Sequence, residues 1–319
     1  MFKNYKYFLT LSEELNITRA SEKLFVTHQG LSRYLSKLEK ECGVQLFYRK
    51  PKLRLTENGQ LFLNKARQIE FMEQTLKNRF LSTLEGSSGS IKIGTTEGRF
   101  RIFIPQLIAK FNSLYPNVEL KVVSASAADL YNQLINNKLD YILIGMPHKT
   151  FSFIQSRIIL KEKLYVVISD DMLKKYFPKA YPNCIKFFRA GIDLKQWSHI
   201  PFAFNIPDAN SSKMIQTFLD ANHIKINKTH VSNYPDLHHV LTEKNYAASF
   251  CLTMYLPNLA RINSETTNKL YVFPINGLSE YNPVAVLYHK DKEFPIYEKK
   301  LMGLIKEQGK YYESYHYEN

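Results

Sequence analysis

Two groups of residues near the start of the chain have side chains suited to contacting a nucleic acid. The first group combines short and forked polar side chains: Thr27, His28, Gln29, Ser32 and Arg33. The second group places four cations within six residues: Arg49, Lys50, Lys52 and Arg54. Polar groups of the first kind can hydrogen-bond to base edges, while lysine and arginine neutralise phosphates. We therefore predict that the first group reads DNA bases and that the second contacts the DNA backbone.

The apolar residues around these groups predict the elements that hold them. Apolar residues recur at three- and four-residue steps in three successive segments, which predicts three short helices. Thr27 is expected to cap the third helix, and Leu31, Leu35 and Leu38 are expected to face the core. Three helices followed by a basic hairpin are typical of a winged helix-turn-helix. The alternative, a solvated face on a small helical bundle, is disfavoured because the basic hairpin follows at the distance that a wing needs.

Residues spread through this segment resemble the LysR family of transcriptional regulators. The matching positions include Ala20, Leu24, Leu31, Ser32, Arg33, Leu38, Glu39, Gly43, Leu46, Phe47, Arg49 and Thr56. The resemblance implies a sequence-specific regulator that binds double-stranded DNA as a homodimer or homotetramer, with RNA polymerase as a further expected partner. The chain has His28 and Gly30 where the family usually has Gln and Ala, so the base preference is not carried over.

A long helix is predicted after the winged segment of residues 1–58. Its apolar residues recur at helical spacing: Phe62, Ala66, Ile69, Met72, Leu76 and Phe80. A sustained stripe on an otherwise polar helix favours pairing with a second helix, and the resemblance implies that this linker, residues 59–88, forms the dimer. The alternative is that the stripe packs on its own chain. The Gly- and Ser-rich residues 85–90 are expected to act as a hinge.

Residues 89–305 alternate between strand-like and helix-like patterns, which predicts an α/β domain with a parallel sheet and helices on both faces. The residues also resemble the LysR effector domain, which implies the two-subdomain fold of periplasmic binding proteins. We expect subdomain I at about 89–165 and 270–305, and subdomain II at about 166–269. Residues 244–249 stand where the family has a Gly-x-Gly stretch, and Asn245 can accept the left-handed conformation that Gly would supply there. Residues 306–319 are expected to form a loosely ordered tail.

In folds of this kind a ligand lies between the subdomains, at strand ends and helix N-termini. By position, one wall of the site is expected to contain Thr95, Thr96, Ser124, Ser126 and Met146, and the other Asn205 and Phe250. We predict a small-molecule effector, and an anionic one is favoured over a cationic one. The sequence does not give its identity. The alternative for each residue is that it caps a helix or a turn. An alternative for the whole protein is a vestigial pocket, with regulation by a protein partner or by redox state.

The composition limits the remaining classes. The chain has 43 Lys and Arg against 29 Asp and Glu, a formal charge of +14, which favours a polyanionic partner. The three cysteines lie far apart and have no metal-site spacing, so neither a zinc site nor a disulfide framework is expected. No nucleotide-binding or hydrolase motif is present, which argues against an enzyme. No long apolar run or leader pattern occurs, so we expect a cytoplasmic protein without a membrane segment.

Overall fold

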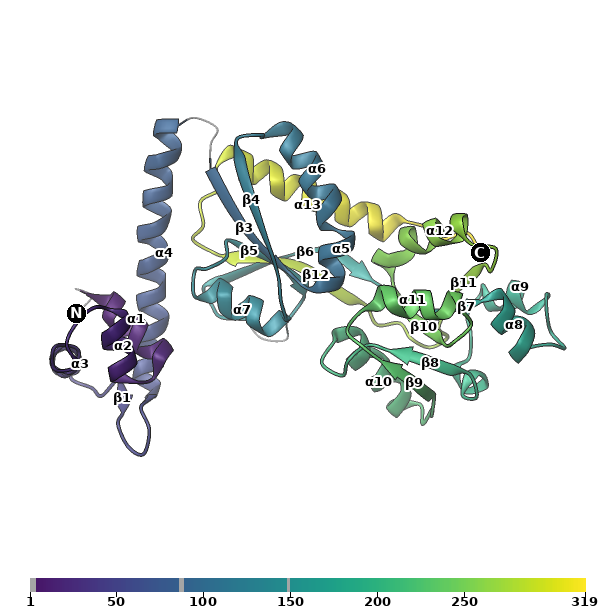
Figure 1. The fold of residues 1–319 in the computed structure, drawn as a ribbon, viewed down its shortest axis with the longest axis horizontal. Coiled ribbons are helices and arrows are strands. Elements are labelled where there is room, and N and C mark those ends of the chain that lie inside the picture. The colour runs from purple at the N-terminus through teal and green to yellow at the C-terminus, as the bar shows by residue number, and fades with distance from the viewer. Residues whose placement is uncertain (1–3, 86–88, 148–149) are drawn as a thin grey trace.

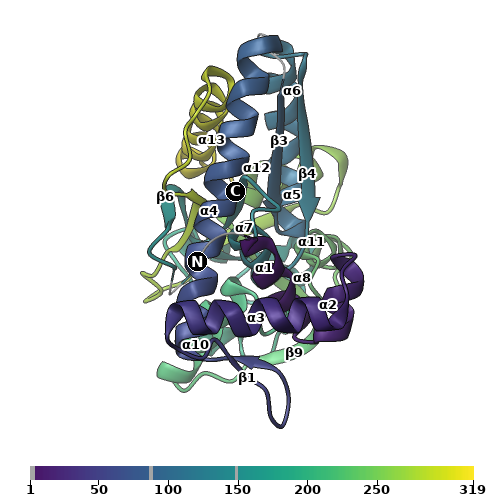
Figure 2. The same cartoon turned by 90° about the vertical axis from the view of Figure 1, so that its left-hand side faces the viewer.

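The head of the molecule is a small helical domain with a two-stranded wing. A computed structural model describes residues 4–85, 89–147 and 150–319 (Figure 1). The head comprises α1 (Tyr5–Glu14), α2 (Ile17–Lys23) and α3 (His28–Cys42), then β1 (Phe47–Tyr48) and β2 (Arg54–Leu55). The hairpin loop between these strands extends below α3 in Figure 2. The predicted winged helix-turn-helix is confirmed.

Local capping explains where the short helices of the head begin and end. The Asn16 side chain accepts a hydrogen bond from the Arg19 backbone N–H at 3.1 Å, which caps α2. The Thr27 hydroxyl oxygen accepts one from the Gly30 N–H at 3.0 Å, which caps α3 as predicted. Gly43 follows α3 with a φ of 69°, a left-handed conformation that ends the helix at little steric cost.

The first turns of the long helix α4 (Glu57–Glu85) belong to the head core. Phe62 and Ala66 are buried there, and the Phe62 ring centroid lies 4.6 Å from that of Phe8. Ile69 packs against the same core. These three α4 residues therefore stabilise their own chain, which corrects the prediction that they form a seam with a second helix.

Apolar side chains on one face of α4, both near its start and further along, are left uncovered. Met72 and Leu76 are 55% and 51% exposed, and Leu61 is 60% exposed. These three residues recur at helical spacing, so they share one face of the helix. The side chain of Phe80 lies outside the described residues. The prediction of a dimer seam thus stays open for Met72 and Leu76.

The rest of the chain forms two five-stranded sheets, each defining one subdomain. The first has the strand order β4-β3-β5-β12-β6 and the second the order β11-β7-β10-β8-β9. The first contains β3 (Gly89–Thr95), β4 (Val118–Ser124), β5 (Tyr141–Gly145), β6 (Ile154–Glu162) and β12 (Asn282–His289). The second contains β7 (Leu164–Ser169), β8 (Pro201–Phe204), β9 (Asn227–Val231), β10 (Ala248–Leu252) and β11 (Leu270–Pro274).

Neither sheet is purely parallel, which corrects the prediction. β12 runs antiparallel to both β5 and β6, and β7 runs antiparallel to both β10 and β11. The reason is that the chain crosses between the sheets twice, so the crossing strands run against the strands of the βα units. Because β11 pairs with β7, residues 270–274 belong to the second sheet. The chain therefore returns to the first subdomain after Pro274, later than the expected boundary at about residue 270.

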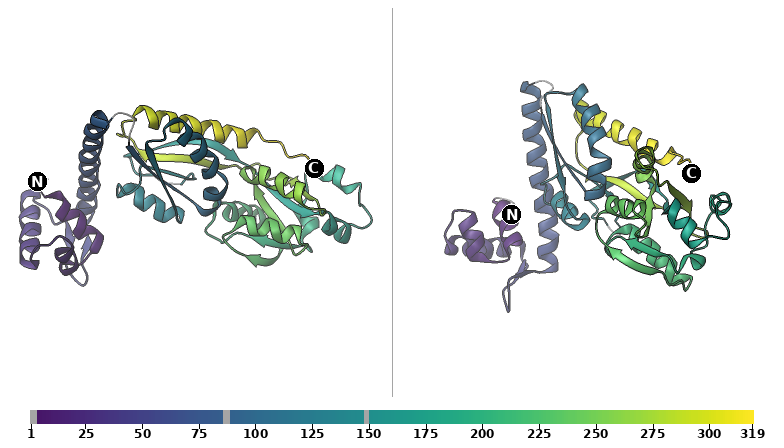
Figure 3. Two further views of the ribbon diagram at one scale, coloured as in Figure 1. Left: turned by 45° about the horizontal axis from the view of Figure 1, so that its top comes forward. Right: turned by 45° about the vertical axis from the view of Figure 1, so that its right-hand side comes forward.

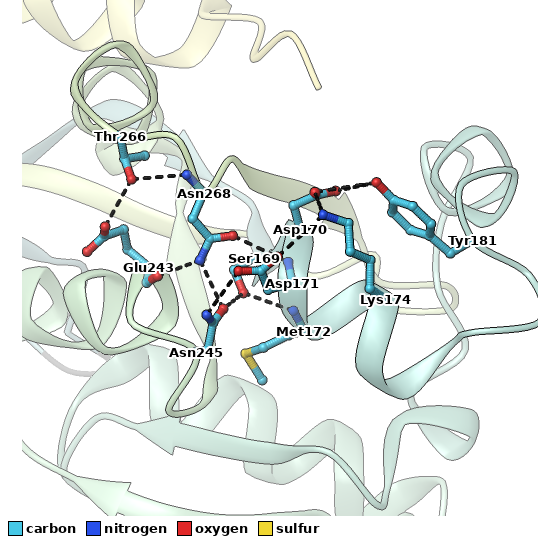
Figure 4. A network of polar contacts seen from close by, with 10 residues as sticks. All are labelled: Ser169, Asp170, Asp171, Met172, Lys174, Tyr181, Glu243, Asn245, Thr266 and Asn268. Atoms are coloured by element: carbon cyan, nitrogen blue, oxygen red, sulfur yellow. Dashed lines mark hydrogen bonds and ion pairs between the residues drawn. The ribbon is translucent and has the colours of Figure 1, made fainter.

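Helices cover both sheets. Those between strands are α5 (Glu97–Ile102), α6 (Ile104–Leu114), α7 (Ala127–Ile135), α8 (Asp170–Tyr176), α9 (Cys184–Phe188), α10 (Asn210–Ala221), α11 (Pro235–Glu243) and α12 (Leu256–Glu265). Two 3₁₀ turns, η1 (Leu194–Trp197) and η2 (Thr253–Tyr255), complete the connections. A network of hydrogen bonds ties the start of α8 to the loop around Asn245 (Figure 4). Asn245 has a φ of 63°, which confirms the left-handed conformation.

The last residues are ordered, which corrects the prediction of a loose tail. Helix α13 (Ile296–Ser314) extends well beyond residue 306, and the Tyr312 hydroxyl donates to the Ile102 carbonyl at 3.1 Å. Tyr317 donates to the Leu270 carbonyl at 2.8 Å. The Asn319 side chain bonds both backbone groups of Val272 at 2.6 Å. The pattern was missed because the polar aromatic residues have no clear period, and their partners are distant in sequence.

The close approach of α4 to the wing leads to a first prediction. A Cβ at Gly59 would lie 2.0 Å from the Leu46 carbonyl oxygen, whereas one at Gly303 in α13 would meet nothing within 4 Å. Gly59→Ala should lower the stability of the head by roughly 1–3 kcal/mol or more, because backbone must move. Gly303→Ala should stabilise by about 0.5–1 kcal/mol. Calorimetric unfolding of both variants checks this, and an undisturbed head transition in Gly59→Ala would contradict it.

Candidate DNA-binding surface and effector cleft

The start of α3 presents the predicted polar group on the surface of the head. Thr27, His28, Gln29 and Arg33 are exposed, and Ser32 is half-buried. The opposite side of α3 carries Leu31, Leu35 and Leu38, all buried in the head core. The amphipathic spacing therefore directs the polar side chains outward. The Thr27 oxygen also caps the helix, so its role is partly structural.

The four cations of the wing are not equivalent. Arg49 Nη2 lies 2.9 Å from Glu39 Oε2 on α3, and the other oxygen of Glu39 accepts hydrogen bonds from the Leu46 and Phe47 N–H groups. Glu39 and Arg49 therefore fasten the wing to the recognition helix, a role that the sequence analysis missed.

The remaining wing cations are available to a partner. Arg54 lies over the Tyr48 ring, 4.6 Å from its centroid, and it remains exposed. Lys50 and Lys52 are exposed as well. Of the predicted phosphate contacts, these three are the ones whose charge is not neutralised by a carboxylate among the described residues.

A cavity of about 420 Å³ lies between the two subdomains. Five of the predicted effector residues line it: Thr96, Ser124, Ser126, Asn205 and Phe250. Two do not. Thr95 is fully buried and its hydroxyl donates to the Leu143 carbonyl at 2.8 Å, and Met146 lies outside the cavity lining. Thr95 was misplaced because strand alternation turns its side chain into the sheet layer while Thr96, the next residue, faces the cleft.

Three of the lining residues also have local structural roles. The Ser126 hydroxyl oxygen accepts from the Asp129 N–H at 3.1 Å and so caps α7. The Ser124 hydroxyl donates to Glu97 Oε2 at 2.9 Å. Thr96 Oγ1 accepts from Arg99 Nη1 at 3.1 Å. Because the Thr96 oxygen acts here as an acceptor, its O–H proton is free to donate into the cavity.

A buried ion pair lies beside the cleft, and one of its members, Arg99, lines it. Arg99 Nη2 lies 2.9 Å from Glu162 Oε2, and the Glu162 side chain has no solvent exposure. Asn282 donates to the same oxygen at 2.8 Å, and Asn210 of α10 lies 3.4 Å from Asn282. This chain of polar contacts links the first subdomain to the start of a helix in the second. Removing one partner of such a pair leaves an unpaired buried charge, which costs about 3–5 kcal/mol.

The electrostatics of the cavity combine opposing contributions. The first turn of α10 lines it, and Ala209, the residue before that helix, provides no side-chain cap for the free N–H groups. These groups favour an anionic atom. Glu97 and Asp208 also line the cavity and oppose it. Burial lowers the pKa of His238 to about 4, so this lining imidazole is neutral at pH 7.

The described residues contain no cluster of three or more His, Cys, Asp or Glu side chains that could hold a metal ion. Within the same residues, no helix combines the length and the apolar character needed to cross a membrane.

Comparisons with known proteins agree with this architecture. A probable RuBisCO transcriptional regulator of Phaeodactylum tricornutum is 26% identical over 212 residues, which are 66% of this chain and 64% of the relative. BudR of Raoultella terrigena is 29% identical over 165 residues, covering 51% of this chain and 57% of the relative. The chain thus spans less than two thirds of the length of these curated relatives.

Solved structures and family models extend the comparison to nearly the whole chain. Full-length CbnR complexed with its target DNA matches with a TM-score of 0.53 at 17% identity, covering 98% of this chain and 99% of CbnR. The model for bacterial regulatory helix-turn-helix proteins of the lysR family matches residues 2–60, and that for the LysR substrate binding domain matches residues 84–310. Because these two models span far more than half of the sequence, the chain belongs to the LysR family.

Proposed function

We propose that the protein is a DNA-binding transcriptional regulator whose activity responds to a small molecule held in the cleft. The observation that carries the first half is the exposed polar start of α3 beside a basic wing. Such a helix can enter the major groove while the wing contacts phosphates. CbnR, which has this fold, was solved with its target DNA. We also propose that the protein acts in the cytoplasm, where it would reach its DNA.

The DNA-binding proposal predicts different effects for the two groups of residues. Ser32→Ala and Arg33→Ala should each reduce discrimination between operator and random DNA by roughly 1–3 kcal/mol if the residue contacts a base. Lys52→Ala should weaken both affinities alike and reduce the salt slope by about one. Fluorescence anisotropy over a salt series measures both quantities, with Lys195→Ala in η1 as the control. Equal operator binding by a fragment lacking residues 1–60 would refute the proposal.

We propose that α4 pairs with α4 of a second copy through Leu61, Met72 and Leu76. These exposed apolar side chains share one face, whereas Phe62 and Ala66 are already buried in the head. A dimer would place two heads on an interrupted palindrome, so that the two half-sites reinforce each other.

The assembly proposal can be tested without disturbing the head core. Replacing Met72 and Leu76 together with Glu should shift the protein toward monomer, because carboxylates in an apolar seam would be buried without partners. Operator affinity should fall with it. Gln60→Glu, on an exposed position outside this face, should leave the mass in solution unchanged. Sedimentation velocity reports the outcome, and an unchanged mass for the double variant would show that the seam lies elsewhere.

The cleft is the best candidate for the effector site because it combines a cavity between the subdomains, the Thr96 hydroxyl and the N–H groups at the start of α10. We propose an effector with an acidic group near the start of α10. A cysteine-based redox response is disfavoured, since burial raises the pKa of the thiols of Cys42, Cys184 and Cys251. Oxidation proceeds through the thiolate, which such a shift depletes. We also propose that the DNA-bound protein contacts RNA polymerase, as the family resemblance implies.

The effector proposal predicts that Thr96→Val blunts the response while leaving basal DNA binding intact. Valine keeps the shape but removes the hydroxyl donor, whereas Thr96→Ser should retain the response. A ligand found by thermal-shift screening of metabolites would be added to a DNase footprint of each variant. A wild-type footprint that no bound ligand alters would support a vestigial pocket instead, since a ligand shifts an equilibrium only by its difference in affinity.

A further inference from the structure

The linker helix α4 is docked on the first subdomain at two points. Asn137, just after α7, donates from Nδ2 to the Arg67 carbonyl at 3.1 Å and to Glu70 Oε2 at 3.3 Å. One turn further along, the Phe71 ring stacks on the His289 ring with centroids 3.9 Å apart and planes inclined by 16°. The helix runs alongside this subdomain in both views of Figure 3. These two contacts therefore fix α4 and the first subdomain on either side of a space that lies between them.

That space is a second cavity, of about 790 Å³, bounded by α1, α4 and the first subdomain. None of its lining residues lines the cleft between the subdomains. Its cations come from separate segments: Lys6, Arg67, Lys92, Lys121 and Lys138. Its acids are fewer: Glu13, Glu70 and Asp140.

The acids of this cavity are already engaged. Asp140 accepts from the Lys92 N–H at 2.8 Å and lies 2.9 Å from Lys292 Nζ. Glu70 Oε2 accepts a hydrogen bond from Asn137 Nδ2, and burial raises the pKa of the Glu70 carboxyl. Glu13 lies 3.7 Å from Lys23, outside the cavity.

Two of the five cations form ion pairs with carboxylates, and three do not. Lys6 pairs with Glu73 at 3.3 Å and Lys121 with Glu119 at 2.9 Å. The side chains of Arg67, Lys92 and Lys138 make no ion pair with a residue that the structure describes. Arg67 is half-buried, and burial lowers the pKa of its guanidinium. Glu13 and Glu70 stabilise the Arg67 charge only in part, since burial outweighs them, and a bound anion would offset more of that cost.

We propose that this cavity binds a small anion bearing more than one phosphate group, held by Arg67, Lys92 and Lys138. Arg67 can form paired hydrogen bonds to phosphate oxygens, while the lysines act as mobile point charges. Because the three cations lie on different segments, an extended oligophosphate matches them better than a single charge does. Such an anion would bridge α4 and the first subdomain. It would thus stabilise the docked position of the helix that carries the head.

The experiment is calorimetric titration of the full-length, DNA-free protein with sodium tripolyphosphate at constant ionic strength. The wild type should show one saturable site. Replacing Arg67 and Lys138 with Gln should weaken binding about tenfold or more for each lost contact. Asn137→Gly should also weaken it, since glycine keeps the φ of 54° but releases the helix without changing any charge. Arg67→Lys should retain part of the affinity.

Matched variants separate this site from the other anion-binding surfaces. Replacing Lys50 and Lys52 of the wing with Gln should leave tripolyphosphate binding unchanged, and so should Thr96→Val in the cleft. Unfolding temperatures would show that each variant is folded. The proposal is overturned if binding is not saturable, or if the wing variant loses it. It is also overturned if the Arg67 and Lys138 variant loses only DNA affinity, which would assign this face to DNA.

Discussion

The burial of the first turns of α4 in the head core is the constraint on which the rest of the molecule depends. Phe62 and Ala66 complete a core that the three short helices could not close alone, and Gly59 allows the helix to start directly against the wing. Head and linker therefore move as one body. Because α4 is also clamped by Asn137 and stacked on His289, the direction of the recognition helix is set by a contact with the first subdomain.

The cleft depends on the opposite kind of chemistry, a buried charge pair in place of an apolar core. Arg99 and Glu162 come from the first subdomain, yet their contacts reach α10 of the second through Asn282 and Asn210. A Cβ at Gly145 would lie 2.3 Å from Asn210 Nδ2, so the absence of a side chain there lets the two subdomains meet. A ligand beside Thr96 would contact the same arrangement that fixes the position of α10.

The sequence was most informative where structure is local. Helix caps such as Thr27 and the apolar faces of the head helices follow from short-range rules, and the sequence predicts them. It was least informative where a residue's partner is distant. Only the fold brings together the segments that decide three features. These are which apolar residues of α4 are buried in the head, the contact of Glu39 with the wing, and the pairing of Arg99 with Glu162. Thr95 and Thr96 differ by one position, and strand alternation alone places one inside and the other in the cleft.

The final residues have a consequence for solubility. β11 is the outermost strand of the second sheet, so one side of it would present unpaired backbone groups that can recruit a strand from another molecule. The Asn319 amide occupies both backbone groups of Val272, and the Tyr317 hydroxyl occupies the Leu270 carbonyl. These side chains form the hydrogen bonds that a neighbouring strand would form, but they do not extend the sheet. Asn263 of α12 likewise bonds both backbone groups of Leu270, so polar side chains from α12 and from the final residues protect this edge from aggregation. These bonds also explain how a polar segment without periodicity can be held in a single conformation.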